Sequence, residues 1–211
     1  MKIRVLTILF LVFLSCKNTT EKEIENVQIV VDSTGLKIEK AEKPIENSKL
    51  IAFLENPIDL QDFKKKKGMR FTTSVTNGTE YYSNPKIKDS IFYVYYYPSE
   101  NLADSRKIDN IVVFKYGENK HRYIDQTENL IELRVFNKDS DLGKANLIGL
   151  SKMEMESEFG NDYLTLDNRL IYSEKNKILI LELENSKIKS FNYIKLSTEK
   201  IDSDLIRKIT E

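Results

Sequence analysis

Hydrophobic residues recur at near-helical spacing in two short segments of the first third of the chain. Pro44 suits the first turn of a helix, apolar residues follow on one face, and Asn56-Pro57 predicts the end of this helix. A second helix is predicted from Asp59, a favoured N-cap residue, to Gly68. Its last turn is the lysine run 64–67, which we interpret as a solvated helix end, because cations favour the negative end of the helix dipole. A patch for phosphate or lipid headgroups is the alternative.

Beyond residue 68 the hydrophobic pattern alternates with a period of two, which predicts strands. Asn77-Gly78 lies between threonine-rich flanks and predicts a tight hairpin. The short connections favour antiparallel pairing. The strands predicted in this region are 69–76, 79–83, 91–97, 110–116, 121–125 and 130–136.

The strand predicted at 91–97 is unusually rich in tyrosine. Alternation places Tyr93, Tyr95 and Tyr97 on one face of this strand. Rigid rings with a polar tip are favoured at binding surfaces, so we take these three residues as the candidate binding face. The alternative is that the same face lies under a helix, with the hydroxyl groups reaching water at its edge.

The last third of the chain begins with a short helix whose two ends are marked in the sequence. Ser151 and Glu154 have the spacing of a capping box, and Leu150 and Met155 have that of a hydrophobic staple. Gly160 stands where a helix commonly ends. Strands are then predicted near 170–173, 177–184 and 187–196, the last two joined by a turn at 185–186.

Together these elements predict an α+β protein with an antiparallel sheet and short helices packed on one face. Residues 44–136 are expected to form a first α+β unit, and 137–211 a second. The spacing of capping residue, apolar partners and glycine near 59–68 is repeated at 151–160, which favours two tandem helix-turn-helix and sheet repeats. The alternative is that two short capped helices share this spacing by chance.

The first 16 residues have a different pattern: basic Lys2 and Arg4, an apolar run at 5–14, and a lone cysteine. The apolar run is about ten residues long, too short for the roughly 20 residues of a membrane-spanning helix. We therefore expect residues 1–15 to be a cleaved signal peptide. Residues 16–43 are rich in Glu, Lys, Asn and Thr, a composition typical of a flexible tether, in which only 27–31 has the character of an edge strand.

The residues Phe13-Leu14-Ser15-Cys16 resemble the lipobox of bacterial lipoproteins, in Bacteroidota-like form. The resemblance implies that Cys16 is diacylated, becomes the first residue of the mature protein and anchors it to a membrane. Lys17 in place of Asp after the cysteine favours the outer membrane, by analogy with enteric lipoproteins. The first acidic residue comes only at Glu21, which favours the periplasmic face over export to the cell surface. Each buried methylene of such a chain contributes about 0.8 kcal/mol to membrane binding. The alternative is an ordinary cysteine after a conventional signal peptide.

A second resemblance covers residues 145–197. In order, Gly149-Leu150-Ser151, a short helix ending at Phe159-Gly160, a strand with Tyr172 and two strands around 185–188 resemble the small lipoproteins of the barrel-assembly machinery (SmpA/OmlA, also called BamE) and the β-lactamase-inhibitor-protein fold. The resemblance implies a helix-turn-helix that leads into a three- or four-stranded antiparallel sheet. In the inhibitor-protein fold, helices cover one side of the sheet and the other side faces a partner.

Charge and composition limit the kinds of partner and of catalytic or metal site that this protein can have. The chain has 33 basic and 33 acidic residues, and loss of Lys2 and Arg4 with the leader leaves 31 against 33, a net charge of −2, which gives no general attraction to nucleic acid. His121 is the only histidine, which excludes a metal cluster of several histidines. It lies in the turn-like segment 117–121 and is expected to be exposed there, which argues against a Ser-His-Asp triad. We predict no metal, no cofactor and no catalytic residue.

These observations favour a non-enzymatic, membrane-anchored envelope lipoprotein that binds a protein partner or serves as an assembly module. An inhibitor or immunity-like lipoprotein that blocks a secreted hydrolase is the main alternative. A glycan or cell-wall hydrolase is a third, and it requires two carboxylates about 5 to 9 Å apart in a cleft.

Overall fold

The computed structural model describes residues 47–67, 71–97, 107–138 and 141–210, and within them the chain forms an eight-stranded antiparallel sheet with short helices. The predicted α+β class is therefore confirmed. The helices are α1 (Ser48–Glu55), α2 (Leu60–Lys67), α3 (Lys152–Phe159) and α4 (Ser203–Thr210), with a 3-10 turn η1 at Gly143–Ala145. The strands are β1 (Thr72–Thr76), β2 (Ser90–Tyr97), β3 (Asp109–Tyr116), β4 (Asn129–Val135), β5 (Leu164–Leu166), β6 (Arg169–Glu174), β7 (Lys177–Glu184) and β8 (Lys187–Lys195).

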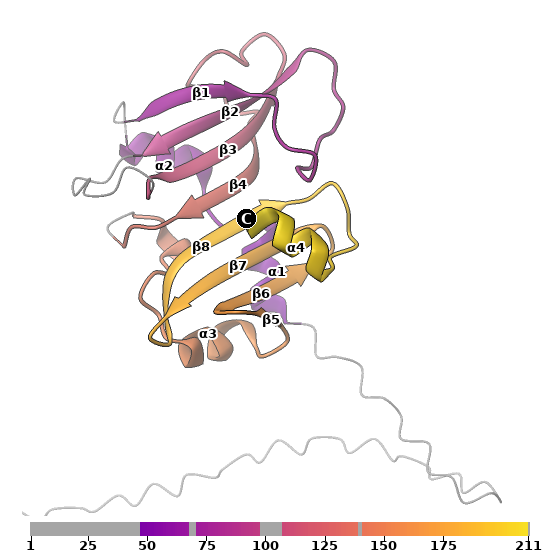
Figure 1. The fold of residues 1–211 in the computed structure, drawn as a ribbon. Helices are drawn as coiled ribbons and strands as arrows, with labels where there is room; N and C mark the ends of the chain where they lie inside the picture. The colour runs from indigo at the N-terminus through magenta and orange to yellow at the C-terminus, as the bar shows by residue number, and fades with distance from the viewer. Residues whose placement is uncertain (1–46, 68–70, 98–106, 139–140, 211) are drawn as a thin grey trace, which may run out of the picture. The chain divides into compact units, whose positions relative to one another are not determined.

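The sheet is built from two four-stranded meanders joined side by side, in the order β1-β2-β3-β4-β8-β7-β6-β5 (Figure 1). Strands β4 and β8 meet at the centre, where residues 132–135 pair antiparallel with 191–194. Strands β1 and β5 are the two edges. Short helices precede each meander in the chain, α1 and α2 before β1 and α3 before β5. The tandem-repeat hypothesis stays a prediction.

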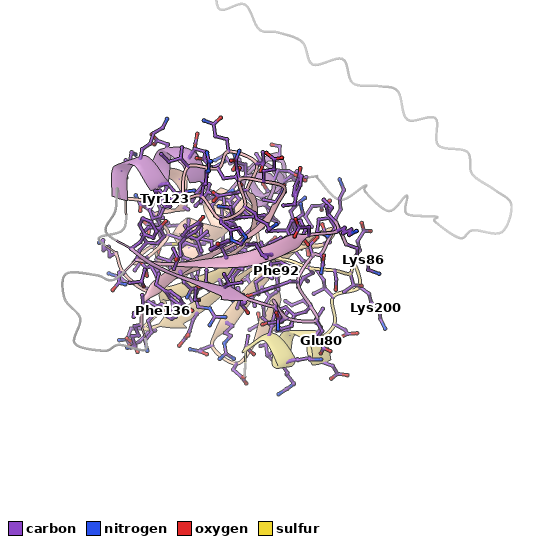
Figure 2. The ribbon with its side chains drawn as sticks, turned by 90° about the horizontal axis from the view of Figure 1, so that it is seen from above. Glu80, Lys86, Phe92, Tyr123, Phe136 and Lys200 are labelled. Atoms are coloured by element: carbon purple, nitrogen blue, oxygen red, sulfur yellow. The ribbon has the colours of Figure 1, made fainter. Side chains whose placement is uncertain are left out.

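Each face of the sheet has its own core. Helices α1, α2 and α3 cover one face, and α4 covers the other (Figure 1). In Figure 2, where the molecule is seen from above and the sheet from its edge, Tyr123 lies on the α2 side and Glu80 beside α4, with Phe92 between them. Helix α4 was not predicted, and it adds a second covered face to the one expected. Asp202 caps it by accepting from the backbone N–H of Leu205 at 3.0 Å.

The elements of the last third follow their local signals. Ser151 and Glu154 form the predicted capping box, and Gly160 ends α3 with a φ of 79°. Asn185 and Ser186 both have positive φ, the conformation of a tight hairpin turn between β7 and β8. Strand β5, of three residues, was not predicted.

The predicted hairpin at Asn77-Gly78 is wrong, because β1 pairs with β2 instead and residues 77–89 form a long connection. The tyrosine ring of Tyr82 is buried in the core under α4, and its hydroxyl donates to the buried carboxylate of Glu132. The strand predicted at 79–83 shrinks to a single bridge between Tyr82 and Leu196. Burial of this aromatic ring outweighs the local turn signal.

The strand predicted at 121–125 is also wrong, because these residues form turns and bends. Two of their carbonyl groups accept hydrogen bonds from buried lysine side chains and so have partners outside any strand ladder. The expectation that Lys64 is solvated is also wrong. Its side chain is one of these two buried lysines and is only 3% exposed. Gly68, the predicted end of this helix, lies outside the described residues.

Candidate functional site

A cluster of buried charges lies between α2, β2, β3 and the segment that leads into β4. Lys64 comes from α2, Lys115 from β3 and Tyr95 from β2, while Asp125 and Glu128 come from the segment before β4. Lys115 lies in phase with the apolar residues of β3 that face α2, so the alternation of the strand turns its charge inward. Four charged side chains therefore share one core with α2.

Glu128 is the centre of this ion cluster. Its carboxylate side chain is fully inaccessible, and both of its oxygens lie 2.8 Å from the Lys64 ammonium. The Lys115 ammonium is 3.0 Å from Oε1, and the Tyr95 hydroxyl donates to the same oxygen at 2.5 Å. Gln61 approaches the other oxygen at 3.3 Å. A buried carboxylate with this many donors is favourable only as part of a satisfied network.

Backbone and aromatic groups complete the network. Lys64 donates to the carbonyl of Tyr123, and Lys115 donates to the carbonyl of Arg122 at 2.5 Å. The two ammonium groups also lie over aromatic faces, Lys64 4.4 Å from the centre of the Tyr123 ring and Lys115 5.0 Å from that of Tyr93. The segment 122–125 is thereby held against the sheet.

Burial shifts the protonation of these groups. Burial lowers the pKa of Lys64, and its contacts with Glu128 oppose that change. Burial, followed by the contacts with Glu128, raises the pKa of Tyr95 far above its usual range. Burial alone would raise the pKa of Asp125, but hydrogen bonds from Thr127 and the nearby lysines lower it overall. At neutral pH Tyr95 is therefore a neutral donor and Asp125 a carboxylate.

A pocket of about 280 Å³ opens beside the ion cluster. The rings of Phe71 and Tyr123 stack at one wall, with centres 4.2 Å apart. At the rim the hydroxyl of Tyr93 is 2.9 Å from Nδ1 of His121. The complete lining is Phe71, Thr73, Tyr93, Tyr95, Lys115, His121, Arg122 and Tyr123, and it contains no carboxylate.

Arg122 gives this pocket its available charge. Lys115 is already shared among Glu128, Tyr95 and the Arg122 carbonyl, so its ammonium protons are used. The Arg122 side chain is exposed and has no ion pair with any residue that the structure describes. The pocket can therefore accept an anionic group between aromatic walls.

The three tyrosines predicted as a binding face have different positions. Tyr95 and Tyr97 are 1% and 4% exposed and lie under α2, where Phe63 packs edge-on against Tyr97 at 4.9 Å. An open docking face of three tyrosines is therefore wrong, because α2 must bury Phe63 and uses this face to do so. The alternative of a face under a helix describes Tyr95 and Tyr97. Tyr93 and Tyr95 both line the pocket, and of the two only Tyr93 is partly exposed. Cys16 lies outside the described residues.

Sequence reasoning missed the main members of the site. Lys115 carried a usable signal, since a lysine in phase with Ile111 and Val113 must be buried with a partner or break the strand. Lys64 was hidden in its lysine run, and nothing near Glu128 indicates a buried carboxylate. His121 was expected in a turn at the surface and is exposed there, bonded to Tyr93.

Among the described residues no group of three or more His, Cys, Asp or Glu side chains is arranged to hold a metal ion. No helix in the described ranges is long and apolar enough to cross a membrane.

Comparison of the chain with protein-family models, curated proteins and solved structures gave no match.

Proposed function

We propose that this protein is a membrane-anchored envelope lipoprotein that acts by binding a protein partner and not by catalysis. The binding role is supported by the pocket beside Tyr93, which has aromatic walls. In its lining, Arg122 is the charged side chain that has no ion pair with any described residue. Aromatic rings and arginine are the side chains most enriched where proteins bind one another.

The ion cluster supports a binding role because its groups are already occupied. Glu128 accepts from Lys64, Lys115 and Tyr95 together, which leaves it poorly placed to move a proton to or from a substrate. The same contacts hold the pocket wall in one arrangement. A wall that is ordered before the partner arrives reduces the entropic cost of binding.

The proposed membrane anchoring is supported by the first 16 residues of the sequence. A basic start, a short apolar run and Cys16 after a small residue support export and lipidation of the cysteine. Two or three acyl chains on one residue give stable membrane attachment. We place the protein at the outer membrane, on the periplasmic face.

A second candidate is favoured by the arrangement of the sheet. Two four-stranded meanders, each preceded by short helices, agree with the two-repeat architecture implied by the resemblance to the inhibitor-protein fold. An inhibitor or immunity-like lipoprotein would co-purify in equal amounts with a single secreted hydrolase and abolish its activity. The absence of such an enzyme from purified, crosslinked complexes would count against this candidate.

The anchor is tested by metabolic labelling with palmitate. Wild-type protein is expected to take up the label and to fractionate with the outer membrane, whereas Cys16→Ala loses the label and leaves the membrane fraction. Ser15→Ala is the matched control, because it keeps a small residue before the cysteine and retains the label. A native protein whose amino terminus carries no lipid, or still begins at Met1, would overturn the proposal.

A further inference from the structure

Strand β1 has a free edge. It pairs with β2 on one side, and no strand among the described residues pairs with its other side. Thr72, Thr73, Ser74 and Val75 are all exposed, and Val75 is an exposed hydrophobic residue at 58%. The backbone groups along this edge are therefore accessible to another extended chain.

This edge lacks the features that usually prevent pairing with other chains. Residues 71–79, FTTSVTNGT, contain no charged residue and no proline. The opposite edge strand, β5, is only three residues long and is flanked by Asp162 and Asp167. Of the two edges, β1 is the longer and the unprotected one.

The pocket beside the ion cluster opens along this same edge. The register pairs Thr73 with Tyr95 and Val75 with Tyr93, so these side chains share the face that holds the pocket. Thr73 and the preceding Phe71 are themselves part of the lining. A strand added beside β1, about 4.8 Å away, would place alternate side chains at the mouth of the pocket.

The charge at the pocket selects the side chain that enters it. The Arg122 guanidinium has no ion pair within the part of the chain that the structure describes, His121 precedes it in the chain, and the lining contains no carboxylate. An acidic side chain is the complement, since arginine binds carboxylates with two parallel hydrogen bonds. An apolar side chain two residues along the added strand, on the same face as the acidic one, would cover Val75.

We propose that β1 is a strand-addition site, at which an extended segment of an envelope partner protein pairs with the free edge and inserts an acidic side chain beside Arg122. The inference rests on the proposed binding function and names its surface and the chemistry of its partner. Backbone hydrogen bonds supply affinity in this mode, and the pocket supplies selectivity.

The test uses the mature lipoprotein in detergent micelles and a blocked peptide, acetyl-Val-Thr-Glu-Thr-Val-Thr-amide, as the probe, in which the glutamate and both valines share one face. Titration to millimolar concentration is expected to shift the backbone amide NMR signals of β1, together with those of Tyr93 and Arg122. The isosteric peptide with glutamine in place of glutamate is expected to bind on the order of tenfold more weakly, because it loses the charge-assisted pair.

Backbone methylation of the probe separates strand pairing from side-chain contact. Every second backbone N–H of a strand points to the same edge. A peptide methylated at its odd-numbered residues therefore blocks one edge, and a peptide methylated at its even-numbered residues blocks the other. One is expected to lose binding and the other to keep it. On the protein, Arg122→Glu is expected to reverse the preference, because the new carboxylate repels the glutamate peptide and not the glutamine peptide. Arg207→Glu on exposed α4 is expected to leave the preference for glutamate unchanged.

Several results would overturn the inference. They are shifts confined to β5 or α4, equal binding by the two methylated peptides, no shifts at millimolar peptide, or a concentration-dependent dimer that pairs through β1 without any peptide. Lipidation at Cys16 is read separately from the mass of the amino terminus. An unlipidated amino terminus would overturn the membrane anchor but not strand addition at β1. Peptide binding at another surface would overturn strand addition but not the membrane anchor.

Discussion

At the scale of single residues, Glu128 decides how the charges of this protein are arranged. Lys64 looks like a surface residue in a run of four lysines, yet its ammonium is buried against a carboxylate 64 positions away. Charged side chains are buried only when they are paired, and a pair so distant in the chain leaves no local pattern. The solvated interpretation of Lys64 failed because its partner is defined only by the fold.

The variant Glu128→Gln removes the negative charge between two buried ammonium groups. Because Lys64 and Lys115 then lack their shared counterion, the free energy of unfolding is expected to fall by about 3 kcal/mol or more. Urea unfolding followed by circular dichroism measures the change.

Glu158→Gln is the control, because it breaks an exposed pair with Lys49 at 3.0 Å. It is expected to change the free energy of unfolding by less than about 1 kcal/mol. Equal, small effects of the two variants would contradict the assignment of a buried ion cluster.

At the scale of elements, local signals succeeded where the relevant contacts are close in sequence. The capping box of α3 joins Ser151 and Glu154, three residues apart, and the turn at 185–186 joins adjacent strands. The hairpin signal at Asn77-Gly78 failed because Tyr82 is drawn into the core under α4. Strand β5 was missed because three residues carry too little pattern to distinguish a strand from a loop.

Ser151→Ala removes the N-cap of α3. The backbone N–H of Glu154, which donates to the serine hydroxyl at 3.2 Å, loses this partner, and a loss of about 1 kcal/mol in the free energy of unfolding is expected. Ser157→Ala, on the exposed face of the same helix, is expected to be neutral or slightly stabilising, because alanine has the higher helix propensity. Urea unfolding compares the two, and a Ser151→Ala protein as stable as the control would contradict the role of the cap.

At the scale of the whole described molecule, the pairing of β4 with β8 joins the two meanders. Each face of the joined sheet carries a core that continues across this junction, from Leu133 to Tyr193 on one face and from Ile131 to Ile194 on the other. The segments 44–136 and 137–211, expected as two α+β units, thus share one sheet.

We expect residues 45–211 to unfold in a single cooperative transition, because separating the meanders would expose the central strands on both faces. Far-ultraviolet circular dichroism and tyrosine fluorescence are expected to report the same urea midpoint. Two separated transitions, or stable folding of 44–136 expressed alone, would show instead that the meanders are independent.

The sequence by itself determined the α+β class, the strands β2, β3, β4, β6, β7 and β8, and the capped helix α3. These features depend on periodicity and on contacts within a few residues, which any reader of the chain can count. Only the tertiary structure decided that Tyr95 and Tyr97 are core residues, that Glu128 holds two lysines, and that the edge of β1 borders a cationic pocket. Each of these features depends on which distant segments pack together. The burial of a side chain and the partner of a buried charge are fixed only by that packing.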